Sequence, residues 1–140
     1  MTPIPYLFFK DGCREAMEFY ARTFGSAPPE VMSFGDLPPD EREKMPGVPG
    51  DAVMHASIKV GDGMIFASDD PSGGAKAMEG CNVHMSMPTL EKAREVFDAL
   101  CEGGEVRMPL EPTFWSPGFG ALTDRWGIRW MIDVEAPAPT

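Results

Sequence analysis

Few residues in this chain have side chains whose type and spacing could carry out chemistry. The 140 residues include two histidines, His55 and His84, and three cysteines. The cysteines are odd in number and form no CxxC pair, so neither a disulfide framework nor a zinc site is predicted. Cys13 falls in the first turn of a predicted helix, where a thiol pKa can be lowered, but three reduced, partly buried thiols are the simpler interpretation. The sequence contains no Ser-His-Asp order, P-loop or dinucleotide fingerprint, which excludes those mechanisms.

An aromatic stretch near the C-terminus could instead bind a small molecule. Trp115 and Phe119 lie between Pro112 and Gly120, in a segment bracketed by proline and glycine. Aromatic side chains in such a loop can stack on a planar ligand. They can equally form a cap over the core, and both interpretations stay open.

The last predicted strand adds two further candidates. Met131 would give a binding site an adaptable apolar lining, although a methionine in an alternating strand can also be plain core. Arg129 is the one basic residue on that strand, and it could pair with an anionic ligand or with Asp133 on the same face. Asp124-Arg125 precedes a tight turn, so turn formation is its expected role.

Hydrophobic periodicity predicts the elements that position these residues. In the first half, Asp51 to Val60 alternates, with Met54 on one face and Val53 and His55 on the other. Gly25 ends the predicted helix as a C′ glycine does. The predicted order is a strand over Ile4 to Phe9, a helix from Cys13 to Phe24, a strand over Glu30 to Phe34, a loop over 35–50, a strand over Asp51 to Val60, a turn at 61–63 and a strand over Met64 to Ser68.

The pattern repeats in the second half, after a linker-like stretch from Asp70 to Lys76. The two helices superpose at an offset of 77 residues, which places Ala16 on Ala93 (93 − 16 = 77) and Tyr20 on Phe97. The predicted elements are a strand over Asn82 to Met87, a helix capped by Thr89 and ended by Gly103-Gly104, and strands over Val106 to Met108, Phe119 to Thr123 and Ile128 to Val134. We therefore expect a first module over residues 1–70, a linker over 71–80, a second module over 81–134 and a flexible tail over 135–140.

Each half thus reads strand, helix, strand, strand, strand. One helix cannot cover both faces of a sheet, and pairing two such modules removes that deficit. The sequence predicts an α+β protein made of two paired βαβββ modules, whose mixed sheets curve around a cleft that could take a small ligand.

Charge and composition exclude several other classes of function. The chain carries 12 basic and 22 acidic residues, a formal net charge of −10. Because phosphate binding relies on Lys and Arg, neither nucleic acid nor an anionic membrane surface is expected as a partner. No apolar run approaches the roughly 18 residues of a membrane-spanning helix. The N-terminus has no basic segment followed by an apolar core, so we expect a cytoplasmic location.

Several motifs, taken together and in order, resemble those of a known superfamily. They are Tyr6-Leu7-Phe8-Phe9, Glu15-Ala16-Met17-Glu18-Phe19-Tyr20, Phe24-Gly25, Val53-Met54-His55-Ala56, Gly61-Asp62-Gly63, Ser68-Asp69-Asp70, Met108-Pro109-Leu110, Phe114-Trp115, Phe119-Gly120 and Asp124 to Met131. This set resembles the vicinal oxygen chelate superfamily, which includes glyoxalase I, bleomycin-resistance proteins and extradiol dioxygenases, and within it the PhnB-like branch. The resemblance covers the chain from about Pro3 to Val134. Members of that branch are often labelled 3-demethylubiquinone methyltransferase-like, but the sequence shows no glycine-rich strand-to-helix turn for S-adenosylmethionine.

The resemblance also implies where a metal would be held. Enzymes of the superfamily usually bind one divalent ion through His and Glu side chains on the inner strands, two from each module. Carried onto this sequence, the four positions fall at about Pro5, Ala67, Asn82 and Met131. None of these is a good ligand for a divalent metal, so no metal and no other cofactor is predicted.

A shifted metal site is the alternative to that conclusion. His84 lies two residues from Asn82, Asp69 lies two from Ala67, and His55 is in the middle of a strand. Two histidines and a carboxylate form a known metal-binding composition. The competing interpretation is a pair of hydrogen-bonded strand histidines and a carboxylate that forms a turn.

Three functions therefore remain open from the sequence. The first is a metal-free protein that binds a small, partly apolar or aromatic molecule, with cleft candidates His55, Asn82, His84, Trp115, Phe119, Arg129 and Met131. The second is a metal-dependent lyase, isomerase or dioxygenase that uses the shifted site. The third is a non-catalytic interaction module. A homodimer is expected by resemblance and because the exposed edges of small sheets invite pairing.

Overall fold

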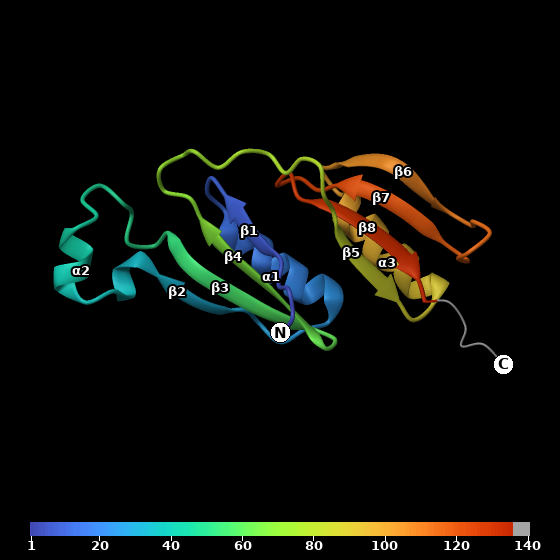
Figure 1. The fold of residues 1–140 in the computed structure, drawn as a ribbon, viewed down its shortest axis with the longest axis horizontal. Helices are drawn as coiled ribbons and strands as arrows, with labels where there is room; N and C mark the ends of the chain where they lie inside the picture. The colour runs from blue at the N-terminus through green and yellow to red at the C-terminus, as the bar shows by residue number, and fades with distance from the viewer. Residues whose placement is uncertain (136–140) are drawn as a thin grey trace. The chain divides into compact units, whose positions relative to one another are not determined.

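The computed structural model describes residues 1–135, which divide after Lys76 into two units (Figure 1). The second unit begins at Ala77. Most of the predicted tail lies outside the described residues. Within residues 1–135, no helix is long and apolar enough to cross a membrane.

The first unit is a four-stranded mixed sheet with one long helix against it. Its strands are ordered β1-β4-β3-β2, with β1 parallel to β4 and the other pairs antiparallel. The elements are β1 (Tyr6–Phe9), α1 (Cys13–Phe24), β2 (Glu30–Ser33), the 3-10 helix η1 (Phe34–Asp36), α2 (Pro39–Glu43), β3 (Val53–Val60) and β4 (Gly63–Asp69).

The second unit repeats this topology. Its strands are ordered β5-β8-β7-β6, again with the first strand parallel to the last. The elements are β5 (Val83–Met87), α3 (Leu90–Cys101), β6 (Glu105–Glu111), β7 (Phe119–Thr123) and β8 (Arg129–Val134). The predicted α+β class and the duplicated βαβββ module are confirmed.

Both long helices have the bounds that their sequence signals indicate. Gly25 adopts a left-handed conformation with φ of 71°, which stops α1 without the steric cost of a Cβ. Thr89 caps α3, and its hydroxyl accepts a hydrogen bond from the Lys92 backbone N–H at 3.1 Å. The apolar stripes pack on the sheets and bury Cys13, Ala16, Met17, Tyr20 and Ala21 from α1, and Ala93, Val96, Phe97 and Leu100 from α3.

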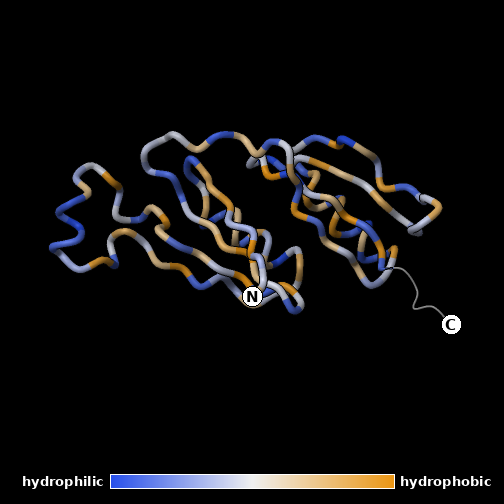
Figure 2. The backbone as a smooth tube through the Cα atoms, viewed as in Figure 1, coloured by the Kyte–Doolittle hydropathy of each residue, from blue (hydrophilic) through white to orange (hydrophobic). Residues whose placement is uncertain are grey.

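Each sheet therefore has one face covered by its helix and one face that its helix does not cover, which we call the open face. Successive side chains of a strand point to opposite faces of its sheet. Figure 2 colours the backbone by hydropathy, and both hydrophilic and hydrophobic residues occur along the strands. On β1, Leu7 and Phe9 are buried toward α1, whereas the side chains of Tyr6 and Phe8 are 42% and 59% exposed. The core of each unit lies between helix and sheet, and the open faces carry the remaining strand side chains.

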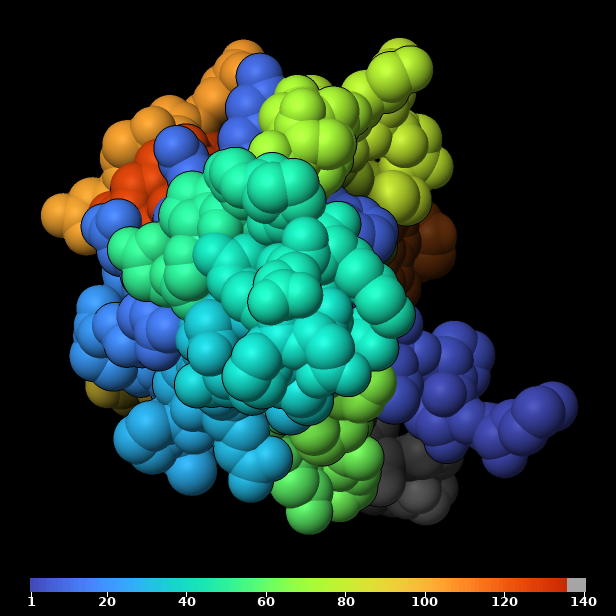
Figure 3. Space-filling view, turned by 90° about the vertical axis from the view of Figure 1, so that its left-hand side faces the viewer, coloured from blue at the N-terminus to red at the C-terminus, as the bar shows by residue number. Residues whose placement is uncertain are grey.

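The predicted loop over 35–50 contains more structure than expected. The Gly35 N–H donates to the Gly50 carbonyl at 2.8 Å, which joins the two ends of the segment. The segment begins within η1 and contains α2, which buries none of its residues. The segment projects toward the viewer at the centre of Figure 3. A helix without an apolar stripe leaves no periodic signal in the sequence, so the prediction of a plain loop was incomplete.

One face assignment on β3 was wrong. Val53 was expected on the same face as His55, but Val53 is 1% exposed and His55 is half-buried. The pairing of β2 with β3 shifts register between Met32 and Ser33, so Met32 pairs with His55 and Ser33 with Val53. This bulge places one extra residue, Met54, in β3 and turns Val53 toward the core.

Candidate functional site

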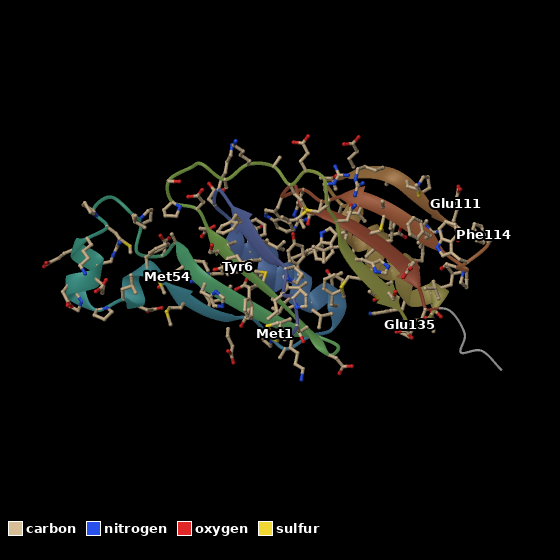
Figure 4. The ribbon with its side chains drawn as sticks, viewed as in Figure 1. Met1, Tyr6, Met54, Glu111, Phe114 and Glu135 are labelled. Carbon is tan, nitrogen blue, oxygen red and sulfur yellow. The ribbon has the colours of Figure 1, made fainter. Side chains whose placement is uncertain are left out.

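The open face of the first sheet carries a cluster of aromatic rings. Tyr6 and Phe8 come from β1, Phe66 from β4 and His55 from β3. The Tyr6 ring centroid lies 5.1 Å from that of Phe8 and 6.2 Å from that of Phe66, and the His55 and Phe66 centroids are 4.9 Å apart. Tyr6, at the beginning of β1, is labelled in Figure 4. Exposed, mutually packed rings of this kind offer an apolar surface on which a planar molecule can stack.

A polar pair lies inside this aromatic cluster. The Tyr6 hydroxyl and His55 Nδ1 are 3.1 Å apart, and the two ring centroids are 5.7 Å apart. When the phenol donates to Nδ1, the other ring nitrogen of a neutral imidazole carries the proton. His55 can then offer an N–H group to a carbonyl or other acceptor of a bound molecule. The aromatic surface thus includes one directional contact.

On the second sheet, the open face holds a hydrogen-bonded trio of polar side chains. His84 Nε2 lies 3.1 Å from one Asp133 carboxylate oxygen, and the Ser86 hydroxyl donates to the other at 2.5 Å. The carboxylate lies between the serine and the histidine, so the histidine does not contact the hydroxyl as a general base would. Both carboxylate oxygens of Asp133 thus have a partner, and the contact with Asp133 positions His84, whose side chain is 51% exposed.

Two guanidinium groups lie near the other end of this sheet. Arg107 donates from Nε to the Thr123 hydroxyl at 3.1 Å, and from one terminal nitrogen to the Asn82 amide oxygen and the Leu122 carbonyl. Arg129 Nε donates to the Cys81 carbonyl at 3.1 Å. Burial, and secondly the charge of Arg129, hold the pKa of Arg107 below its usual value, with Glu105 acting in the opposite direction.

The aromatic loop between β6 and β7 is well anchored. Trp115 packs edge-on against Phe114 at 4.7 Å and Phe119 at 5.5 Å between ring centroids. Ser116 is buried, and its hydroxyl donates to the Gly118 carbonyl at 2.7 Å. Phe114 and Trp115 remain 97% and 50% exposed, and Phe114 is labelled in Figure 4. The loop therefore presents its rings to the outside, and these two rings do not cap the core.

Asp69 has a structural position at the N-terminus of α1. Its carboxylate accepts hydrogen bonds from the Cys13 N–H at 3.0 Å and the Val53 N–H at 2.8 Å. These donors lie on the helix-covered side of the sheet, opposite the aromatic cluster that contains His55. The third member of the shifted site, His84, belongs to the second unit. The structure therefore places His55 and Asp69 on opposite faces of one sheet.

The positions implied by resemblance do not fit the metal of the superfamily either. Ala67 is fully buried on the helix side, and its neighbour Phe66 is the residue that reaches the open face. Asn82 is engaged by Arg107, and Met131 pairs in register with His84. Among residues 1–135, no three His, Cys, Asp or Glu side chains are grouped so that they could hold a metal ion.

The first unit also contains a cavity at the start of α1, away from the open face of its sheet. Its volume is about 490 Å³, and it is lined by the turn before α1, the first turns of that helix, Pro49 and residues 51–53. Lys10, Arg14 and Asp69 are among its polar lining residues. This cavity is separate from the aromatic cluster, which lies on a sheet face.

Sequence reasoning found some of these residues and missed others. It named His55, Asn82, His84, Trp115, Phe119, Arg129 and Met131, and the structure distributes them between the two units. It missed Tyr6, although the alternation of β1 would have placed Tyr6 and Phe8 on one face. It also missed Arg107, whose contacts lie 15 or more residues away in the sequence.

Comparisons with known proteins agree with this architecture. The family model described as the Glyoxalase/Bleomycin resistance protein/Dioxygenase superfamily matches residues 5–132. Protein YjdN of Escherichia coli (strain K12) is 33% identical over 142 residues, which cover 97% of each chain. The crystal structure of protein PA1353 from Pseudomonas aeruginosa is 39% identical with a TM-score of 0.85, covering 96% of this chain and 98% of that one. The PhnB protein from Bacillus cereus is similar in fold, with a TM-score of 0.76 at 20% identity over 96% of this chain and 100% of that one.

Proposed function

Because the chain belongs to the Glyoxalase/Bleomycin resistance protein/Dioxygenase superfamily, we propose that it binds a small, planar, partly apolar molecule. The observation that carries this proposal is the ring cluster of Tyr6, Phe8, His55 and Phe66 on the open face of the first sheet. Aromatic side chains exposed together on a rigid sheet give a large contact area with little loss of side-chain entropy on binding. The Tyr6–His55 pair orients the bound molecule.

The proposed binding does not use a metal centre. Sequestration of a small molecule requires only a complementary shape and stacking. The chemistry of the metal-dependent relatives requires, in addition, a set of side chains that coordinate a divalent first-row metal ion. The donor chemistry of the described residues supports this view, because Asp69 is committed to backbone N–H groups of α1 and β3. We further propose that the chain acts as a homodimer.

A fluorescence titration with N-phenyl-1-naphthylamine, a neutral planar dye, tests the binding surface. Phe8 is 59% exposed, so Phe8→Ala removes a stacking ring at little cost to the fold. We expect this variant to weaken dye binding about threefold to tenfold. Phe19→Ala, which deletes the same side chain from α1 on the other side of the sheet, is the matched control and leaves the dissociation constant unchanged.

Equal dissociation constants for the wild type and Phe8→Ala would contradict the proposed surface. A thermal-shift screen of planar aromatic compounds widens the test, since a ligand at 100 times its dissociation constant stabilises the protein by about 2.7 kcal/mol. A screen without any stabilising compound would favour the non-catalytic interaction module.

Elemental analysis of the purified protein tests the second part of the proposal. We expect no stoichiometric divalent metal, and no change in dye binding on addition of EDTA. His55→Ala and His84→Ala are then expected to leave the metal content unaltered. Retained metal that either substitution removes would establish the metal-dependent alternative.

A further inference from the structure

The open face of the second sheet carries two arginines whose placement the ring cluster does not explain. The pairing of β6 with β7 shifts register between Val106 and Met108, so Arg107 is the extra residue of a β-bulge. A bulge redirects a side chain, and bulges are common beside functional sites. Here the Arg107 guanidinium contacts the Thr123 hydroxyl, on the same face of β7 as Ala121 and Phe119.

Arg129 lies on the same face. It pairs in register with Thr123, and its charge acts on that of Arg107. Within the described residues, neither guanidinium forms an ion pair with a carboxylate. The nearest acidic candidate on β8, Asp133, is instead bonded to His84 and Ser86. Glu105 pairs in register with Thr123 and its charge acts on Arg107, but in the part of the chain that the structure describes it forms no ion pair with either guanidinium. Two like charges are thus held together without a paired carboxylate in a chain whose net charge is −10.

Asn82 adds a neutral donor to this pair. An arginine has only donors, so the Asn82 atom that meets Arg107 must be the amide oxygen. The amide nitrogen of Asn82 therefore points away from Arg107 with its two N–H groups available. Arg107, Arg129 and Asn82 together present N–H donors of the kind that bind carboxylate and phosphate oxygens.

We propose that Arg107, Arg129 and Asn82 form an oxyanion subsite on the open face of the second sheet, which binds a small molecule carrying a carboxylate or phosphate group. This inference goes beyond the proposed function, because the ring cluster belongs to the first unit and this subsite to the second. Beyond Arg129, the same face of β8 continues through Met131 to Asp133, which pairs with Phe119. Alternate strand residues are about 6.6 Å apart, so this row offers about 13 Å of surface for the rest of the ligand.

A pair of dyes that differ in one anionic group tests the subsite. The probes are 8-anilino-1-naphthalenesulfonate and its uncharged analogue N-phenyl-1-naphthylamine, titrated at constant ionic strength. Arg129→Gln removes one charge and one exposed hydrogen bond. We expect it to raise the dissociation constant of the sulfonate about tenfold and that of the neutral dye less than about twofold.

Arg94→Gln is the matched control, because it removes the same charge from α3, where Arg94 bonds the Leu110 carbonyl. It should leave both dissociation constants unchanged, and near-UV circular dichroism checks that each variant is folded. Arg107→Lys keeps the positive charge but loses the planar guanidinium with its several N–H donors. We expect this variant to raise the dissociation constant of the sulfonate dye by less than Arg129→Gln does. Equal effects of Arg129→Gln and Arg94→Gln, or no effect of Arg129→Gln on the sulfonate, would overturn the subsite.

Competition by sodium phosphate and by sodium acetate then distinguishes the two oxyanion classes. We expect one of these salts to displace the sulfonate from the wild type at lower concentration than from Arg129→Gln. If the wild type binds neither dye, the proposed function fails, and the subsite is decided separately by inorganic phosphate and acetate in thermal melts. A rise in melting temperature with either salt in the wild type but not in Arg129→Gln supports the subsite, and equal shifts for both proteins reject it.

Discussion

The Asp124 carboxylate organises the turn between β7 and β8. It is 4% exposed and accepts hydrogen bonds from the Trp126 N–H at 2.9 Å, the Ile128 N–H at 3.0 Å and the Trp130 indole N–H at 2.9 Å. Trp130 is fully buried. A single charged group thus holds both the turn and the largest core side chain of the second unit, as the expected turn-forming role of Asp124-Arg125 indicated.

Removing this carboxylate should therefore be costly. We expect Asp124→Ala to lower the free energy of unfolding by about 3 kcal/mol, because buried N–H donors are left without partners. Urea denaturation followed by circular dichroism measures the change. Asp98→Ala is the control, since its carboxylate lies 3.9 Å from Arg94 at an exposed position and should contribute less than about 0.5 kcal/mol. Similar losses for both variants would contradict this role of Asp124.

The Cys13 thiol behaves differently from the reactive thiol that a helix N-terminus can produce. Burial, and then the nearby Asp69 charge, raise the pKa of Cys13 from 9.0 to about 12. The folded state therefore favours the protonated thiol. Its contribution to stability is complete below pH 9 and is lost as the pH rises from 9 toward 12.

This pKa predicts a specific alkaline loss of stability. Between pH 8 and pH 11, the wild type should lose about 2 kcal/mol more of its unfolding free energy than Cys13→Ala, which has no thiol to ionise. Urea titrations at several pH values measure both curves. Parallel curves for the two proteins would show that the buried thiol does not couple to unfolding.

At the scale of elements, the approach of α3 to its sheet depends on a glycine in β7. A Cβ built on Gly120 would lie 2.8 Å from the Phe97 ring and 2.9 Å from the Leu110 Cα. We expect Gly120→Ala to destabilise the protein by about 1–3 kcal/mol through overpacking. Gly63→Ala in β4 is the matched control, because its nearest neighbour would be the Val60 carbonyl at 3.7 Å. Thermal melts that show no difference between the two variants would contradict close packing at Gly120.

The elements differ in how far the sequence could predict them. The helix over Cys13–Phe24 was predicted correctly because apolar periodicity and a terminal glycine agree along its full length. The short helix α2 escaped prediction because Pro39–Glu43 carries no apolar stripe; it is held instead by Arg42, which donates to the Met45 and Val48 carbonyls. Apolar periodicity and terminal glycines can be recognised in the sequence, whereas hydrogen bonds between a side chain and a distant loop carbonyl cannot.

The candidate site was predictable only in part for the same reason. Arg129 was named from its strand and Asn82 from the resemblance, but the residue that joins the subsite to Thr123 is Arg107, which a register shift redirects. Strand bulges depend on the pairing of two segments and leave no periodic signal in either. Likewise, the bulge in β3 reversed the face expected for Val53.

At the scale of the whole chain, duplication explains why two surfaces are available for binding. The helices begin 77 residues apart, at 13 and 90, and both units share one strand order. The units differ in their open faces: the first is aromatic, and the second carries the arginines and the polar trio around Asp133. A common scaffold thus supports two different kinds of contact.

Four strand edges remain in the described chain, at β1, β2, β5 and β6. On three of them large apolar side chains are exposed: the rings of Tyr6 and Phe8 on β1, Met32 at 48% on β2 and Met108 at 49% on β6. Unpaired edges with exposed apolar groups favour association of two copies. We expect sedimentation equilibrium to give a mass of twice 15.3 kDa.

Lysine substitutions at these edges locate the contact between the two copies. A lysine on an interface edge opposes pairing by its charge and by the cost of burying it. We expect either Met32→Lys or Met108→Lys to shift the mass toward 15.3 kDa, with the unfolding transition of each variant confirming that it is folded. Lys59 already lies exposed within a strand, so Lys59→Met is the control and should leave the mass unaltered. A mass of 15.3 kDa for the wild type at every concentration would reject the dimer, because an association that exists must strengthen with concentration.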